Sequence, residues 1–302
     1  MDKLTSKIVL KIQSGFNQYG SRVSRIEKSL EFRSSDLYPI FIIGAPRTGS
    51  TLLFQLMCNN FKFAYINNLM ALLPRYLVGL SAISERFPDN KYVKGSDHGY
   101  VPGLFSPNEA GAIFRKWFEE EHPEIEKRTV RNTVVHLSNK RNKPFLAKNM
   151  VNSKLNRLVN IYTILPQTRF IVLRRDALFT AQSLLKARQQ YSGGIQNWWS
   201  VTPDQHQKIL NRSPYYQVLW QIWKVKQDIQ LFLKRYHPEY LEIDYKKLCT
   251  HTNEVLRSIA SQFGLRRTHD HFNTDNIKYR ESIYLNSHDW NQLMAEYNNF
   301  KI

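Results

Sequence analysis

Apolar stretches alternate along the chain with segments of helical periodicity. Five short apolar stretches are typical of strands, and they occupy residues 38–45, 61–66, 143–149, 168–176 and 240–248. The first of them, "YPIFIIGA", has an unbroken apolar core, as expected of a strand buried on both faces in a parallel sheet. Because helical segments lie between the strands, the sequence predicts an α/β fold with a central, mostly parallel sheet flanked by helices.

The predicted helices have apolar residues at spacings of three and four. They cover residues 50–60, 68–87, 115–141, 153–165, 177–188, 213–236 and 253–265, with Gly264 as the stop signal of the last one. Residues 1–36 predict a basic, amphipathic helical arm. We prefer an arm packed on the main domain, and a peripheral contact with a membrane surface is the alternative. No repeat or low-complexity linker divides the chain, so we predict a single domain over residues 1–302.

Composition narrows the class of protein. With 302 residues, of which 42% are hydrophobic, the chain can bury a full core. It contains no apolar run of the roughly 18 residues that span a bilayer, and its start does not read as a signal peptide. The only cysteines, Cys58 and Cys249, suit neither a disulfide framework nor a zinc site, so a reducing cytoplasm is the default compartment.

The net charge of +18 favours an anionic partner. The basic residues are spread along the chain, and neither a zinc-finger pattern nor an RNA-binding signature is present. We therefore predict no nucleic-acid partner. An acidic membrane surface or a polyanionic small ligand fits the charge equally well.

The stretch "GAPRTGST" at 44–51 follows the first predicted strand and opens a helix. Its spacing fits the first half of the phosphate-binding pattern G-x-x-x-x-G-K-[ST], but Ser50 stands where the lysine would reach a γ-phosphate. Backbone N–H groups at a helix N-terminus bind phosphate without that lysine. Arg47, Thr48 and Thr51 add charge and hydroxyl donors, and Gly49 permits a close approach. The loop is thus predicted to bind an anion.

A second candidate anion site lies at the end of the strand "TRFIVLRRD". Arg175 can pair with a phosphate in a bidentate way, and Ser183, eight residues later on the following helix, can donate to the same anion. Arg174 and Arg175 precede Asp176, so positive charge dominates where an NTPase would need a metal-binding carboxylate. Taken alone, the pair is equally compatible with a strand-end ion pair and a helix serine.

Together, the two motifs resemble those of sulfotransferases that use 3′-phosphoadenylyl sulfate (PAPS). "PRTGSTLL" is similar to their 5′-phosphosulfate loop and "FIVLRRDALFTAQS" to their 3′-phosphate motif. The segment between the motifs, from "PFLAKN" onward, resembles bacterial-type members, and the resemblance covers residues 38–265. It implies a P-loop-NTPase-like sulfotransferase fold. It also implies PAPS as co-substrate, adenosine 3′,5′-bisphosphate as product, and no metal.

The resemblance implies a role for individual residues. The 5′-phosphosulfate would be held by Arg47, Thr48, Gly49, Ser50 and Thr51, and the 3′-phosphate by Arg175 and Ser183. Lys148, which ends the "FLAK" strand, matches a lysine that the family often places near the transferring sulfonate. An exposed strand-end lysine is the alternative for that position.

The general base is harder to assign from the sequence. Several branches of the family carry a glutamate about twenty residues after the loop arginine, where this chain has Asn67 and Asn68. The remaining candidates are His98 first, because its unperturbed pKa is near 6.5, and Glu109 second, if it is desolvated. A turn histidine and an N-terminal helix charge are the structural alternatives.

The acceptor side is predicted from two loop segments. Residues 88–110 and 191–212 should frame the acceptor pocket as mobile lids. Trp198 and Trp199 could stack on an acceptor or pack in the core. Lys278 and Arg280 could close over the 3′-phosphate. The histidines of "HDH" at 269–271 are taken as surface residues rather than as metal ligands.

The leading hypothesis is a PAPS-dependent sulfotransferase that acts on a hydroxyl of a carbohydrate, a glycolipid or another small metabolite. A P-loop NTPase or small-molecule kinase with a degenerate loop is the second hypothesis, and it would require Mg²⁺. A non-enzymatic module that binds a nucleotide or anion is the third.

Overall fold

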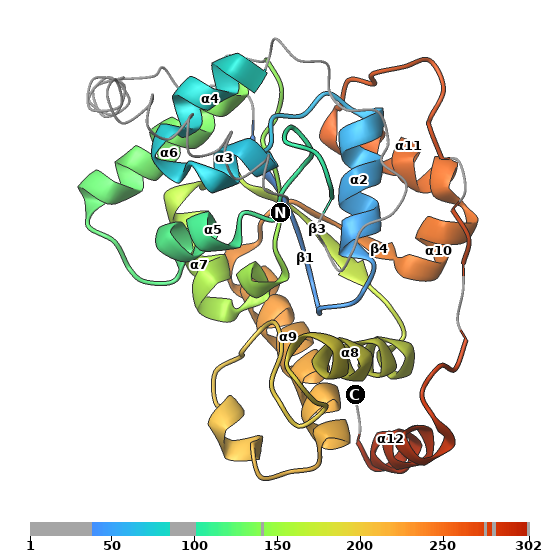
Figure 1. Ribbon diagram of the computed structural model, residues 1–302. Coiled ribbons are helices and arrows are strands. Elements are labelled where there is room, and N and C mark those ends of the chain that lie inside the picture. Colours follow the sequence, from blue (N-terminus) through green and yellow to red (C-terminus); the bar gives the residue numbers. More distant parts are fainter. Residues whose placement is uncertain (1–37, 85–100, 140–141, 275–276, 280–281, 301–302) are drawn as a thin grey trace, which may run out of the picture.

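The computed structural model describes residues 38–84, 101–139, 142–274, 277–279 and 282–300. Within these residues, one parallel sheet has the strand order β2-β1-β3-β4. Figure 1 labels β1, β3 and β4 of this sheet. Its strands are β1 (Ile40–Gly44), β2 (Leu146–Lys148), β3 (Arg169–Arg174) and β4 (Tyr240–Asp244). The predicted α/β class with a parallel sheet and flanking helices is confirmed. The predicted arm at 1–36 lies outside the described residues.

Helices connect and flank these strands. They are α2 (Ser50–Asn60), α3 (Asn68–Leu72), α4 (Leu77–Ser84), α5 (Gly111–Phe118), α6 (Glu124–Asn139), α7 (Leu155–Ile164), α8 (Ala177–Tyr191), α9 (Pro214–Tyr236), α10 (Tyr245–Thr250), α11 (Thr252–Phe263) and α12 (Ser287–Asn299). Three short 3₁₀ turns join them: η1 (Pro74–Tyr76), η2 (Met150–Ser153) and η3 (His206–Ile209). None of the described helices is both long and apolar enough to cross a bilayer.

The register of the strands brings their carboxyl ends to one edge of the sheet. In β1, Ile42 pairs with Lys148 of β2 and Gly44 pairs with Leu173 of β3. Arg174 of β3 pairs in turn with Asp244 of β4. In open parallel sheets, ligands bind outside the carboxyl ends of the strands, at the point where the strand order reverses. Here β1 lies between β2 and β3, so this point is the end of β1, where α2 begins (Figure 1).

Local signals in the sequence set the helix ends near this edge. The Asp176 side chain accepts hydrogen bonds from two backbone N–H groups of α8, and Asp244 caps α10 in the same manner. Ser213 caps α9, whose first residue is Pro214. Gly264 ends α11 in the left-handed conformation, as its position in the sequence predicted.

The core around the sheet is rich in aromatic residues. The ring of Phe41 in β1 lies 6.0 Å from Phe114 and 5.9 Å from Phe118, both in α5. In the adjacent strand, the ring of Phe170 lies 5.2 Å from Phe232 of α9. Because neighbouring strand residues in register project to the same face, α5 and α9 cover the same face of the sheet. This packing fixes the position of α5, which begins two residues after Glu109.

Three predicted elements differ from the structure. Residues 61–66 are extended but form only isolated bridges, including Ala64 with Phe145, so the predicted strand there is wrong. The predicted helix 68–87 is interrupted at Pro74, and the predicted helix 115–141 is interrupted before Pro123. A proline lacks the N–H that a helix interior needs and disfavours helical geometry in the preceding residue. The helical spacing of apolar residues therefore continues in the sequence past two positions where the helix itself is interrupted.

Candidate active site

The loop between β1 and α2 is held in a strained turn. Arg47 has φ 71° and Gly49 has φ 91°, both in the left-handed region. The Thr48 hydroxyl donates to the Ala45 carbonyl oxygen at 2.9 Å, and the Gly44 N–H donates to Oγ of Ser153 at 3.0 Å. A non-glycine residue at positive φ costs about 1–3 kcal/mol and is concentrated at ligand sites. The turn therefore has the conformation of a binding loop, with the N-terminus of α2 behind it.

Gly49 is required by a close contact as well as by its backbone angle. A Cβ at this position would lie 2.3 Å from Cδ2 of Tyr245 and 2.4 Å from its Cε2. The Tyr245 ring thus packs directly on the loop, and the guanidinium carbon of Arg175 lies 4.6 Å from its centre. Sequence analysis missed Tyr245. Its position directly after β4 could have pointed to it, because the carboxyl ends of parallel strands share one edge.

The two predicted anion motifs meet in space. The Nε of Arg47 donates to Oγ of Ser183 at 3.0 Å, although 136 positions separate them. Arg175 donates from its guanidinium to the Arg47 carbonyl oxygen at 3.1 Å. The loop arginine thus bridges the end of β1 to the first turns of α8. Burial lowers the pKa of Arg47, and the neighbouring Arg175 acts in the same direction.

The Nε of Arg175 is buried and has no hydrogen-bond partner among the described residues. An unpaired buried donor costs about 1–3 kcal/mol, so its presence is expected where a ligand supplies the acceptor. The arginine, the loop and Ser183 together offer positive charge and directed donors. This arrangement fits a molecule with two separate phosphate groups.

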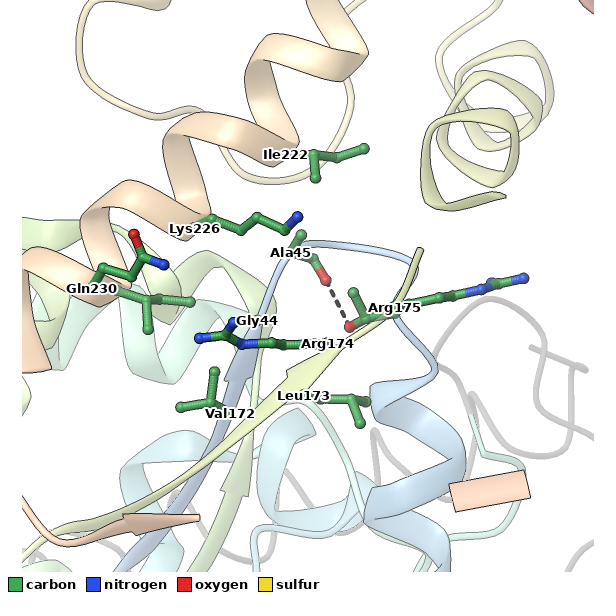
Figure 2. A pocket seen from close by; sticks show the side chains of 11 residues that line it. Gly44, Ala45, Val172, Leu173, Arg174, Arg175, Ile222, Lys226 and Gln230 are labelled. Carbon is green, nitrogen blue, oxygen red and sulfur yellow. Dashed lines mark hydrogen bonds between the residues drawn. The ribbon is translucent and has the colours of Figure 1, made fainter. Parts of the chain in front are cut away.

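Arg174 and Arg175 project in different directions from the end of β3 (Figure 2). Arg174 pairs with Glu242 of β4 at 2.5 Å and is exposed. The cavity drawn in Figure 2, lined by Gly44, Lys226 and others, has a volume of about 20 Å³. That is room for about one water molecule, so this side of the loop offers no space for a nucleotide.

Lys148 and Glu109 form an ion pair beside the loop. The Lys148 ammonium contacts Oε1 of Glu109 and donates to Oγ1 of Thr51 at 2.9 Å. The lysine is 3% exposed, whereas a third of the glutamate side chain is exposed. Burial lowers the pKa of Lys148, and the Glu109 carboxylate opposes that shift. The alternative of an exposed strand-end lysine is thereby excluded.

A network of asparagines holds the segment that carries Glu109. Asn68 donates to the carbonyl oxygens of Val101 at 2.7 Å and Gly103 at 2.6 Å. Asn108, next to Glu109, donates to Oδ1 of Asn68 at 2.6 Å. Asn68 lies in the region where the resemblance led us to expect a glutamate. Here its amide fixes the segment that brings another glutamate to Lys148, and sequence analysis missed this function.

The tryptophans of the second predicted acceptor loop pack inward. Trp198 donates from Nε1 to the Val201 carbonyl oxygen at 2.9 Å, and its ring lies 4.9 Å from the guanidinium carbon of Arg188. Arg188 is fully buried and donates to Oε1 of Gln217 at 2.9 Å. Trp199 is half-buried against the core. Both rings therefore support residues 192–201 rather than standing free as stacking surfaces.

Three further predicted residues are His98, Lys278 and Arg280. His98 and Arg280 lie outside the described residues, and Lys278 is exposed. Its neighbour Tyr279 has its ring 6.2 Å from that of Tyr245. The two histidines at 269–271 are exposed, and the described residues contain no group of three His, Cys, Asp or Glu side chains that could hold a metal ion.

Comparisons with a family model and with solved structures cover most of this chain. The model of the sulfotransferase family matches residues 39–270. Sulfotransferase STF9 from Mycobacterium avium aligns with a TM-score of 0.53 and 15% identity, over 89% of this chain and 78% of that chain. Sulfotransferase STF1 from Mycobacterium tuberculosis H37Rv aligns with a TM-score of 0.48 and 17% identity, over 84% and 72%. A search of curated proteins finds no match. The similarity to STF9 shows a common fold, including the predicted P-loop-like sulfotransferase architecture.

Proposed function

Because the chain belongs to the sulfotransferase family, we propose that it transfers the sulfonate group of PAPS to a hydroxyl of a small-molecule, glycan or lipid acceptor. The family itself implies a transferase with a sulfonate donor and a small-molecule acceptor. The choice of PAPS rests on one observation, the contact between Arg47 and Ser183. This contact joins the two anion motifs, as a donor with both a 5′-phosphosulfate and a 3′-phosphate requires.

In this proposal the 5′-phosphosulfate is held by the loop and the N-terminus of α2. Backbone N–H groups there carry the partial positive charge of the helix dipole, and Ser50 and Thr51 add hydroxyl donors. The 3′-phosphate is held by Arg175 and Ser183. The unpaired Nε of Arg175 supports this assignment, because a phosphate oxygen would supply the missing acceptor.

With the donor bound, an acceptor oxygen forms a bond to sulfur while the bond from sulfur to the bridging phosphate oxygen breaks, and that oxygen leaves with the electron pair. The residues must therefore balance negative charge on the sulfonate and on the leaving oxygen. Lys148 is suited to this task, because its buried ammonium lies next to Thr51 of the loop. A charge fixed in a site of low polarity stabilises a transition state more than one in water.

Glu109 is proposed as the general base that takes the proton from the acceptor hydroxyl. Its contact with Lys148 supports this role, because the base must lie close to the transferring group. An anionic sulfonate would compete for the lysine and leave the carboxylate free to accept a proton. His98, favoured by the sequence alone, stays an alternative prediction.

Binding of adenosine 3′,5′-bisphosphate tests the proposal. Calorimetry should show binding to the wild-type chain and an affinity about tenfold or more lower in Arg175→Ala, as expected for the loss of a charge-assisted hydrogen bond. Arg174→Ala is the matched control, because it removes the same charge from the adjacent residue, which pairs with Glu242 instead. Its affinity should change little. Binding of ATP with Mg²⁺ in preference to the bisphosphate would refute the proposal and favour a nucleotidase.

A further inference from the structure

An open cavity of about 370 Å³ lies between α5, the start of α7 and residues 200–202. Its charged and hydroxyl-bearing lining comprises Arg115, Glu119, Lys154, Arg157, Ser200 and Thr202. The volume falls within the range of about 300–1,000 Å³ that is usual for small-molecule sites. The lining carries four charged side chains, so it suits a charged ligand better than an apolar one.

The charges in this cavity do not balance. Lys154 pairs with Oε1 of Glu119 at 2.9 Å, and Arg157 contacts the other oxygen of the same carboxylate. One glutamate therefore serves two cations. Arg115 is exposed on α5 and has no ion-pair or hydrogen-bond partner among the described residues. The lining thus has three cations against one carboxylate, and an anion is the complementary ligand.

A buried donor also lacks a partner at this site. Arg157 is 2% exposed, and its Nε forms no hydrogen bond to a described residue. Its terminal nitrogens are occupied by Glu119 and by Oδ1 of Asn152, at 3.1 Å in the latter contact. Burial lowers the pKa of Arg157 to about 10, with Arg115 acting in the same direction. An anion in the cavity would relieve the repulsion between the two arginines.

One wall of the cavity contacts the backbone of the segment that carries Glu109. Asn149, which lines it, directly follows Lys148 and donates to the Glu109 carbonyl oxygen at 3.2 Å. Gly111, on the same wall, begins α5, and Arg115 follows one helical turn later, about 6 Å along the helix. The cavity and the Glu109 segment therefore share one wall, formed by Asn149 and the start of α5.

We propose that this cavity is the acceptor site and that it selects an acceptor carrying a phosphate or sulfate ester besides the hydroxyl that is modified. This inference rests on the proposed function, because the site has an acceptor only if the chain transfers a sulfonate group. The donors reach the cavity from three separate segments of the chain, which suits a tetrahedral anion better than a planar carboxylate. Arg115 and Lys154 would bind the ester group at the cavity mouth.

The test is calorimetric titration of the chain, saturated with adenosine 3′,5′-bisphosphate, with inorganic sulfate and in parallel with inorganic phosphate. The bisphosphate occupies the two proposed phosphate positions, and the Arg115 variant separates binding in the cavity from binding at the vacant sulfonate position. Arg115→Gln should weaken binding of the ion about fivefold to tenfold, as expected for the loss of one exposed charge-assisted hydrogen bond. Lys116→Gln is the matched control, because Lys116 is the next residue, is equally exposed and does not line the cavity. It should bind the ion like the wild type.

Equal affinities in Arg115→Gln and the wild type would overturn the inference, as would equal losses in both variants or no binding by the wild type. The stronger of the sulfate and phosphate responses would indicate which ester the acceptor carries. Binding of the bisphosphate is measured first in each variant and should not change. A wild-type chain that binds the ion through Arg115 but not the bisphosphate would contradict the proposed donor and leave the anion site standing.

Discussion

At the scale of single residues, the candidate site depends on charged groups held where water has little access. Lys148 is almost fully buried, yet its ammonium keeps two partners, the Glu109 carboxylate and the Thr51 hydroxyl. Desolvation of a charge is costly, so a buried lysine persists where partners or a ligand compensate it. These contacts make Lys148 and Glu109 the most informative residues for mutation.

The lowered pKa of Lys148 predicts the alkaline side of the pH–rate profile. Only the protonated lysine carries the charge that would stabilise the sulfonate, and burial moves its pKa below the ordinary value of 10.5. The rate of transfer should therefore decline as the pH rises through the lowered pKa. In Lys148→Arg the decline should move to higher pH, because arginine keeps its charge. An unchanged profile in this variant would contradict the role of Lys148.

Substitution of the two candidate bases separates their roles. Glu109→Gln should lower kcat about 100-fold, the order of magnitude that general-base catalysis supplies, while the affinity for the bisphosphate stays unchanged. His98→Ala should then retain most of the activity. Rates from single-turnover transfer of labelled sulfonate provide the measurement. The opposite result, an inactive His98→Ala and an active Glu109→Gln, would return the role of base to His98.

At the scale of elements, the site is assembled from the carboxyl ends of four parallel strands. β1 leads into the loop, β2 ends in Lys148, β3 leads to Arg175, and β4 is followed by Tyr245. The predicted strands at 38–45, 143–149, 168–176 and 240–248 all contain an observed strand, so this shared edge followed from the sequence. The contact of Tyr245 with Gly49 did not follow, because it depends on how the end of β4 lies against the start of α2.

That contact predicts a specific effect of a single added methyl group. Gly49→Ala should lower the free energy of unfolding by about 2 kcal/mol or more and weaken bisphosphate binding, because the new Cβ meets the Tyr245 ring at positive φ. Gly193→Ala is the control. Gly193 has φ 79°, but its nearest neighbour to a new Cβ is 3.8 Å away, so this variant has the backbone strain without the clash.

Urea unfolding and calorimetry give the two measurements for both glycine variants. The Gly193 variant should lose less stability than the Gly49 variant and should bind the bisphosphate like the wild type. If the two variants lost equal stability, backbone strain alone would account for Gly49, and the packing of Tyr245 on the loop would have no measurable effect.

At the scale of the whole molecule, the excess of positive charge agrees with a protein that binds anions at more than one place. The chain has a net charge of +18, and the structure gathers part of it at the Arg47–Arg175 pair and another part in the cavity with Arg115. The first lies at the loop that Lys148 contacts through Thr51, and the second shares a wall with the segment that carries Glu109. In the proposed reaction, one would hold the donor and the other an anionic acceptor.

The sequence by itself determined the α/β class and the loop at 44–51, because periodicity and local motifs are written in contiguous residues. The pairing of that loop with Arg175 and Ser183 followed from the resemblance to a known family. Two predicted helices wrongly extended across Pro74 and Pro123, because the helical spacing of apolar residues continues past both prolines. Only the tertiary structure decided that Glu109 meets Lys148, that Asn68 holds the Glu109 segment, and that three cations surround one cavity. Each of these contacts joins residues from separate segments, so the packing of helices against the sheet, not any local pattern, sets their distance.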